Sequence, residues 1–185
     1  MPYAYATLIF AIMDYHLYLG NFRRAARCIG IAVLASFSLS ACVYVSKPFT
    51  ASEAFKKLPA AQEIIVSVTH VVLSDNKDEA KKFWTYNQDV IDSLPENNGY
   101  LGHKLRLKLF SGEAWTLTVW DDRDALGQFV FGDVHNTAMF EAMSAVARGR
   151  SITASFSVDQ VPPSWEDLEK LMDAEGRNLL ANSDY

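Results

Sequence analysis

His135 is the residue of this 185-residue chain best placed for acid–base chemistry. We expect Asp133 to cap a helix, which puts the imidazole of His135 in the first helical turn. The positive end of a helix dipole favours neutral imidazole over imidazolium. A neutral His135 beside an apolar pocket could accept a proton from an acidic phenol or hold a ligand oxygen. The alternative is that the ring packs on Trp120 and satisfies a backbone carbonyl.

Four other side chains are candidates for a site. Trp120 ends an alternating segment on the face opposite Trp115, so we group it with His135 as a catalytic candidate that walls the pocket; the alternative is plain packing. His70 and His103 lie on otherwise apolar strand faces, where they are either ligand-binding groups or hydrogen-bonded histidines at a sheet edge. Asn87, on the inward stripe of a predicted helix, is a further ligand-binding candidate.

The sequence lacks the motifs of metal binding, nucleophilic catalysis and phosphate binding. None of the four histidines stands at ligand spacing from another or from a carboxylate pair, so we predict no metal site. No serine sits in a recognisable nucleophile elbow, and no glycine-rich phosphate loop occurs. Nucleophilic and phosphate-loop chemistry are therefore not indicated.

The periodicity of apolar residues predicts the elements that position these candidates. A β-branched strand, a helix closed by Pro95, and two alternating strands joined by a Ser111-Gly112 turn are followed by two helical segments and a final strand. Their expected ranges are 63–73, 77–94, 100–110, 114–120, from 123, 133–147 and 151–158. The order β-α-β-β-α-β predicts an α+β, ferredoxin-like fold: an antiparallel sheet with helices on one face.

Two further features lie outside that pattern. Lys104, Arg106 and Lys108 alternate with apolar residues, and we expect them to form a solvated strand face. After Pro162-Pro163, a charged C-terminal helix is expected from Ser164 to about Leu171.

A family resemblance rests on one stretch of the chain. It comprises Thr118 to Asp122, then Ala125-Leu126, Phe129-Val130, and His135 to Met139. This stretch resembles the strand-to-helix signature of the dimeric α+β barrel superfamily, and is most similar to antibiotic-biosynthesis-monooxygenase-like domains. The resemblance covers about residues 63–158. It implies a homodimer that pairs sheets into a barrel, with an apolar pocket between each sheet and its helices.

The same resemblance implies a choice of cofactors. Members of this group include cofactor-independent and haem-dependent oxygenases, so the expected cofactor is none, with haem as the alternative. Haem degradation is disfavoured, because Met139 stands where those enzymes carry an iron-ligating histidine.

The N-terminal segment resembles a bacterial lipoprotein signal. Arg23, Arg24 and Arg27 precede an apolar run that ends in Leu39-Ser40-Ala41-Cys42, similar to a lipobox. Fourteen residues separate Arg27 from Cys42, fewer than the ~20 that a permanent membrane span needs. We therefore predict a signal peptide over 1–41, with translation starting either at Met1 or at Met13, and a lipidated Cys42. The alternatives are a membrane-spanning anchor or a buried N-terminal helix.

These boundaries define the remaining parts. Residues 42–62 are expected to be the lipidated cysteine and a tether, 63–161 the barrel domain, and 162–185 the C-terminal helix and tail. Val43 after the cysteine favours the periplasmic face of the outer membrane, in a cell envelope of that type. Three of the 17 basic residues and one of the 22 acidic ones precede Cys42, which leaves 14 against 21 and a net charge of -7. This charge disfavours nucleic acid as a partner.

Two functions remain open on the sequence alone. One is an oxygenase whose pocket, formed by Trp120, His135 and His70, binds a small aromatic substrate and promotes its reaction with oxygen. The other is a non-catalytic lipoprotein that binds a small apolar or aromatic molecule such as haem, or that acts as a dimeric scaffold.

Overall fold

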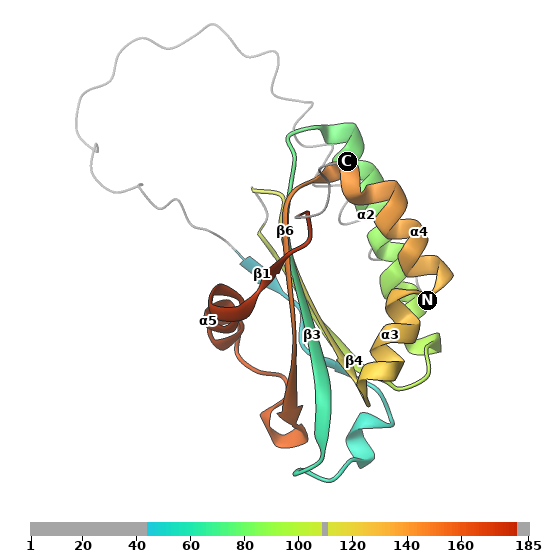
Figure 1. Ribbon diagram of the computed structural model, residues 1–185, viewed down its shortest axis with the longest axis vertical. Helices are drawn as coiled ribbons and strands as arrows, with labels where there is room; N and C mark the ends of the chain where they lie inside the picture. Colours follow the sequence, from blue (N-terminus) through green and yellow to red (C-terminus); the bar gives the residue numbers. More distant parts are fainter. Residues whose placement is uncertain (1–43, 109–110, 181–185) are drawn as a thin grey trace, which may run out of the picture. The chain divides into compact units, whose positions relative to one another are not determined.

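The computed structural model describes residues 44–108 and 111–180, within the second of the two units of the chain, Ala41–Tyr185. The predicted signal peptide, Cys42 and Leu109 lie outside the described residues. The described residues form one antiparallel sheet with helices on both faces (Figure 1). Within this part of the chain, each helix falls short of the length or apolar character that crossing a bilayer requires.

The sheet follows the strand order β1-β4-β5-β3-β6-β7, with the short β2 also paired to β4. The strands are β1 (Tyr44–Ser46), β2 (Thr50–Ala51), β3 (Glu63–Leu73), β4 (Tyr100–Lys108), β5 (Glu113–Trp120), β6 (Val146–Ser157) and β7 (Arg177–Asn178). The central strand β3 pairs along its length with β5 on one side and β6 on the other. β3 is therefore the central strand of the sheet, and the helices pack on the two faces beside it.

Helices cover the two faces unequally. α2 (Lys77–Ser93), α3 (Arg123–Val130) and α4 (Asp133–Ala142) lie on one face, and α5 (Trp165–Glu175) lies on the other (Figure 1). The side chains of Asn76, Asp122 and Ser164 accept backbone N–H bonds at the starts of α2, α3 and α5. The predicted ferredoxin-like α+β fold is confirmed.

The face beneath α2, α3 and α4 has two separate apolar clusters instead of one continuous core. One cluster gathers Trp120, Phe129 and their neighbours, and the other gathers Val71, Leu73 and Val146 with theirs. Between the clusters, β3 carries Ser67 and Thr69, whose side chains are too small to fill the space under the helices. The centre of this layer is therefore hollow.

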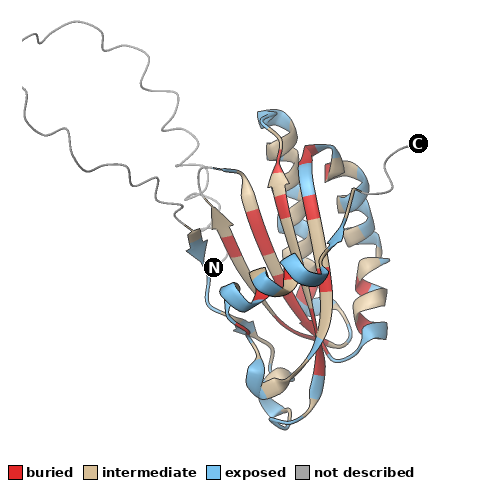
Figure 2. Ribbon diagram, turned by 60° about the vertical axis from the view of Figure 1, so that its left-hand side comes forward, coloured by how far each residue is buried: buried red, intermediate tan, exposed pale blue. Residues whose placement is uncertain are grey.

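The opposite face is closely packed by α5 and the N-terminal segment. Leu168 and Met172 of α5, each 1% exposed, pack on a cluster that includes Val68, Trp115 and Leu117. In Figure 2 the buried positions concentrate in the central strands. This is the face through which the resemblance implies pairing with a second copy, and here the chain's own α5 covers it.

Two segments differ from the expected boundaries. Residues 44–58, expected to be a tether, form β1, β2 and a 3-10 helix, and pack Phe49, Phe55 and Leu58 against the core. The expected helix 133–147 stops at Ala142, and β6 begins at Val146 instead of Ser151. Pairing with β3 extends β6 through Gly149, since a sheet ladder outweighs local helical periodicity.

Candidate functional site

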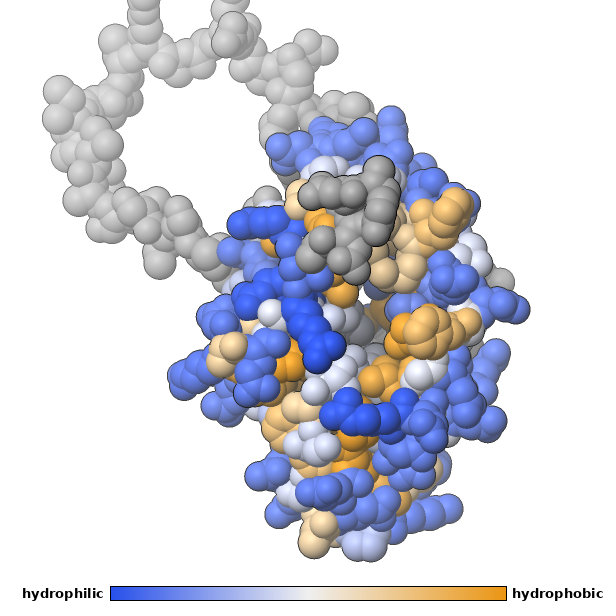
Figure 3. Space-filling model, viewed as in Figure 1, coloured by the Kyte–Doolittle hydropathy of each residue, from blue (hydrophilic) through white to orange (hydrophobic). Residues whose placement is uncertain are grey.

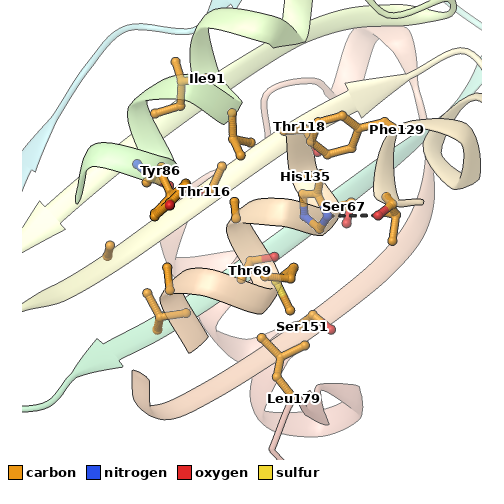
Figure 4. A pocket seen from close by; sticks show the side chains of 18 of the residues that line it. Ser67, Thr69, Tyr86, Ile91, Thr116, Thr118, Phe129, His135, Ser151 and Leu179 are labelled. Atoms are coloured by element: carbon orange, nitrogen blue, oxygen red, sulfur yellow. Dashed lines mark hydrogen bonds between the residues drawn. The ribbon is translucent and has the colours of Figure 1, made fainter. Parts of the chain in front are cut away.

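A cavity of about 320 Å³ lies between the sheet and the helices α2 and α4, in the gap between the two apolar clusters. Figure 4 shows its lining, in which Thr69, Thr116 and Thr118 come from the strands and Tyr86, Ile91 and His135 from the helices. Its volume falls in the range of small-molecule sites. The cavity sits where the resemblance implies an apolar pocket.

The sheet side of the cavity, which we call its floor, is lined by two rows of hydroxyl side chains from β3, β5 and β6 instead of apolar ones. In one row Ser67 of β3 lies opposite Thr118 of β5 and Thr153 of β6. In the next row Thr69 lies opposite Thr116 and Ser151. All of these residues line the cavity: Ser67, Thr69, Thr116, Thr118, Ser151 and Thr153. A floor of this kind can donate or accept hydrogen bonds along the edge of a flat ligand.

The hydroxyl groups of this floor are largely unused within the protein. Of these six side chains, only that of Thr118 forms a hydrogen bond with another described residue: its Oγ1 accepts from Trp120 Nε1 at 2.9 Å. The other five hydroxyls keep their bonding capacity for water or a ligand.

The roof is mostly apolar and comes from α2 and α4. Phe83, Val90 and Ile91 of α2 and Met139 of α4 line it, together with the amide of Asn87. None of the side chains of α2 is fully buried, because its inward face borders the cavity and not a filled core. The roof suits the face of an aromatic ring, and the floor suits polar substituents.

His135 is the titratable histidine of this cavity. It is the third residue of α4, after Asp133, and Gly132 caps the helix in place of the expected Asp133. The Nδ1 atom lies 3.0 Å from the carbonyl oxygen of Val130 (Figure 4). A carbonyl oxygen can only accept, so Nδ1 carries the hydrogen and Nε2 keeps a free lone pair.

Burial keeps this imidazole neutral. It lowers the pKa of His135, although the bond to Val130 partly opposes that shift. The ring also packs against Phe129, with centroids 4.8 Å apart. His135 is thus a fixed, uncharged proton acceptor at the wall of the cavity.

Trp120 stands behind the cavity and does not line it. The indole is fully buried and packs on Phe129, at 4.8 Å between ring centroids, and on Tyr100 at 5.9 Å. Its N–H is taken by Thr118. Trp120 can act on the cavity only through the Thr118 hydroxyl and the Phe129 ring, which is a positioning role.

His70 and His103 lie elsewhere. His70 is on the α5 face, where it stacks on Trp115 at 4.0 Å and contacts Glu113 Oε1 at 3.0 Å through Nε2. His103 Nδ1 lies 2.5 Å from the hydroxyl of Tyr100, and burial raises the pKa of Tyr100 to about 12. Of the five predicted site residues, the structure brings only His135 and Asn87 together in the cavity.

The basic row of β4 is not the solvated face that alternation indicates. Arg106 is 6% exposed, and its guanidinium lies over the rings of Tyr44, Trp115 and Trp165. It forms an ion pair with Glu169 of α5 at 2.5 Å. The N-terminal segment and α5 bury this side of the sheet, so Arg106 joins both to it.

The hydroxyl floor went unrecognised in the sequence. Ser67, Thr69, Thr116 and Thr118 alternate with large apolar residues, which is also the pattern of a strand with one solvated face. The distinguishing signal was available: Ile65 and Val71 flank the hydroxyl pair on the same face of β3, so that face had to be covered.

Metal ligation finds no support among the described residues. In this part of the chain no group of three or more His, Cys, Asp or Glu side chains could hold a metal ion.

Comparison with known proteins gives matches among solved structures only. No family model and no curated protein matches the chain. A Caulobacter crescentus protein assigned to the antibiotic biosynthesis monooxygenases is 20% identical, with a TM-score of 0.43, over 53% of this chain and 92% of its own. A variant of SnoaB, a cofactor-independent oxygenase from Streptomyces nogalater, is 16% identical, with a TM-score of 0.42, over 56% and 100%.

In a third match, the matched protein is about twice as long as the part that aligns with this chain. It is a protein from Lactobacillus acidophilus assigned as a monooxygenase, 13% identical with a TM-score of 0.44 over 53% of this chain. The match spans about half of that protein, 48% of its length.

Proposed function

We propose that the cavity under α2 and α4 binds a small aromatic molecule that carries hydroxyl or carbonyl groups. The observation that carries this proposal is the pairing of an apolar roof with a floor of six hydroxyls. A flat ring would lie against Phe83 and Ile91, with its oxygens directed to Ser67 and Thr69.

The proposed reaction is proton removal from an acidic phenol by His135. Nε2 accepts the phenolic proton, and the imidazolium stays hydrogen-bonded to Val130 through Nδ1. The resulting phenolate is richer in electrons and is the species that would react with molecular oxygen as the second substrate. Burial keeps His135 neutral and its lone pair available at pH 7, and the bond to Val130 partly offsets the effect of burial against the imidazolium.

A second candidate is ligand binding without catalysis. Among the described residues, Tyr86 and His135 are the only ionisable side chains that line this cavity. A site with one imidazole, one phenol and no further ionisable group also suits a carrier that binds an apolar molecule without transforming it.

A ligand screen with an oxygen electrode separates the two functions. Naphthols, hydroxylated anthrones and haemin are titrated against the full chain, and oxygen uptake is followed for each. The oxygenase proposal expects saturable binding of a phenolic probe and ligand-dependent oxygen uptake. Saturable binding without uptake leaves the carrier function, and no binding across the panel contradicts both.

We also propose that lipidation of Cys42 anchors the chain in the cell envelope. The support is the lipobox-like sequence Leu39 to Cys42. Since β1 begins at Tyr44, two residues later, the folded unit would lie directly at the membrane surface and not on a tether. Incorporation of labelled palmitate by the native chain, and its loss in Cys42→Ser, tests the proposal; equal labelling in both contradicts it.

The resemblance implies a homodimer that pairs sheet faces, but α5 covers the sheet face that would be used. Leu168 and Met172 occupy the sheet face that a barrel would use. We propose that any homodimer forms through another surface. Figure 3 shows apolar surface on the helix side, where Phe131 and Phe140 are 83% and 86% exposed.

A further inference from the structure

A second cavity of about 450 Å³ lies on the other face of the sheet, between β3, β5, β6 and α5. It shares no lining residue with the first cavity. Its lining is mainly polar and includes His70, Glu113, Arg148, Arg150 and Asp173. Nothing in the proposed phenol chemistry uses these groups.

The carboxylate of Glu113, which lines this cavity, already accepts several hydrogen bonds from within the protein. Glu113 Oε1 accepts from the Tyr44 hydroxyl at 2.9 Å and from Trp115 Nε1 at 3.4 Å, and Oε2 accepts from Lys108 at 3.3 Å. Burial alone would raise the pKa of Glu113, but these bonds lower it to about 2. Glu113 is therefore ionised, and His70 Nε2 donates to it as well.

The two acidic side chains of α5 that line this cavity, Glu169 and Asp173, are also paired. Glu169 pairs with Arg106 at 2.5 Å, and Asp173 pairs with Arg150 at 3.0 Å. Arg150 also donates to the carbonyl oxygen of Met172, and this bond holds the Arg150 guanidinium against α5. These pairs leave little uncompensated negative charge in the cavity.

The unmatched charge is positive. Arg148 lines the cavity two residues before Arg150, so both side chains lie on the same face of β6. Arg148 is exposed, and its guanidinium has no ion pair or side-chain hydrogen bond in the described part of the chain. Arg150 is partly exposed and keeps N–H groups beyond those that it uses.

We propose that this second cavity binds an oxyanion of the phosphate class, held by Arg148 and Arg150. Two guanidinium groups on alternate positions of one rigid strand form a fork that suits phosphate oxygens. The oxyanion belongs either to a soluble phosphate ester or to a phospholipid head group. The site is independent of the cavity under α2 and α4, so neither proposal fails with the other.

The test follows the indole N–H signal of Trp115 in the full chain, purified in detergent. Trp115 lines the cavity and donates to Glu113, so its signal reports on this site. Sodium phosphate is titrated at constant ionic strength. The proposal expects a saturable shift, at least fivefold weaker binding in Arg148→Gln, and no change in Arg123→Gln, an exposed arginine at the start of α3.

Arg148→Gln is the decisive variant because, among the described residues, the Arg148 side chain has no ion pair or hydrogen bond to lose. Arg150→Gln also removes the bonds of Arg150 to Asp173 and Met172 of α5, so a loss of binding there is interpreted only if the folded spectrum is retained. Absence of a saturable shift, or equal affinity in wild type and Arg148→Gln, overturns the proposal. Glycerol 3-phosphate and monomeric dihexanoyl phosphatidic acid are then compared: tighter binding of the lipid identifies the head-group source, and equal binding identifies a soluble ester.

Discussion

The imidazole of His135 donates from Nδ1 to the carbonyl oxygen of Val130 across 3.0 Å. Val130 ends α3 and His135 lies in the first turn of α4, so the bond ties together the two helices that meet at the cavity wall. It also fixes the tautomer, which leaves Nε2 as the acceptor. One hydrogen bond thus sets both the position and the chemistry of the proposed base.

Replacing His135 tests its role as proton acceptor. His135→Gln keeps a polar side chain of similar size but removes the base, and we expect ligand-dependent oxygen uptake to fall by about 10²- to 10⁴-fold. Affinity for the phenolic ligand should change much less. The matched control is His103→Gln, because His103 lies outside the cavity; a comparable loss of uptake there would contradict the assignment.

The pH dependence of turnover follows from the neutral state of His135. Burial lowers its pKa below the usual value near 6.5, so the base stays free at neutral pH and is lost only as the pH falls through the lowered pKa. We expect oxygen uptake to be level above neutrality and to decline on the acid side. A rate that rises on acidification would contradict the neutral-base assignment.

The same shift predicts how stability depends on pH. Between the lowered folded pKa and the unfolded value near 6.5, the unfolded chain binds the proton that folded His135 refuses. The free energy of unfolding should therefore decrease as the pH falls through that window and should then level off with respect to His135. Urea unfolding of wild type and His135→Gln across this range measures it: wild type should lose stability relative to the variant as the pH falls through the window, and the difference should then stay constant.

The hydroxyl floor should select oxygenated ligands. Thr69→Val keeps the shape of the side chain and removes the hydroxyl, so we expect about tenfold weaker binding of a polyhydroxylated ring, in line with one lost hydrogen bond. Binding of the unsubstituted ring should be unchanged or tighter. Thr137→Val, at an exposed position of α4, is the control. Equal effects on both ligands would show that the floor does not contact them.

The covering of the sheet by α5 can be measured as stability. Leu168 is 1% exposed in the core of the α5 face, so Leu168→Ala should lower the free energy of unfolding by about 2–5 kcal/mol. Lys170→Ala, on the exposed side of the same helix, should leave it nearly unchanged. Urea unfolding provides both values. A near-zero cost for Leu168→Ala would mean that α5 does not hold this face in solution.

Much of the fold could be predicted from local pattern. The alternation of β-branched residues gave β3 its ends at Glu63 and Leu73, and the apolar stripe and Pro95 placed α2 to within one residue. These segments are predictable because burial repeats with the period of the element itself. β6 was harder, because Gly149 looks like a helix end and the pairing that keeps it in a strand comes from distant β3.

The site was less predictable, for a reason visible at Ser67 and Arg106. A hydroxyl or a cation that alternates with apolar residues indicates solvent unless a second layer covers it, and that layer comes from remote parts of the chain. α2 and α4 cover Ser67, and α5 with the N-terminal segment covers Arg106. The bulge between Tyr100 and Gly102 adds to this, since it shifts which residues of β4 share a face.

The central claim is that Nε2 of His135 is a free proton acceptor that meets the ligand in the cavity. The most direct measurement is the pair of ¹⁵N imidazole signals of His135 in the full chain, with and without a saturating naphthol at pH 7. The proposal predicts the Nδ1–H tautomer in the free protein and a marked shift at Nε2, with Nδ1 nearly constant, when the ligand binds. An Nε2–H tautomer in the free protein, or an Nε2 signal that saturating ligand does not move, would contradict it.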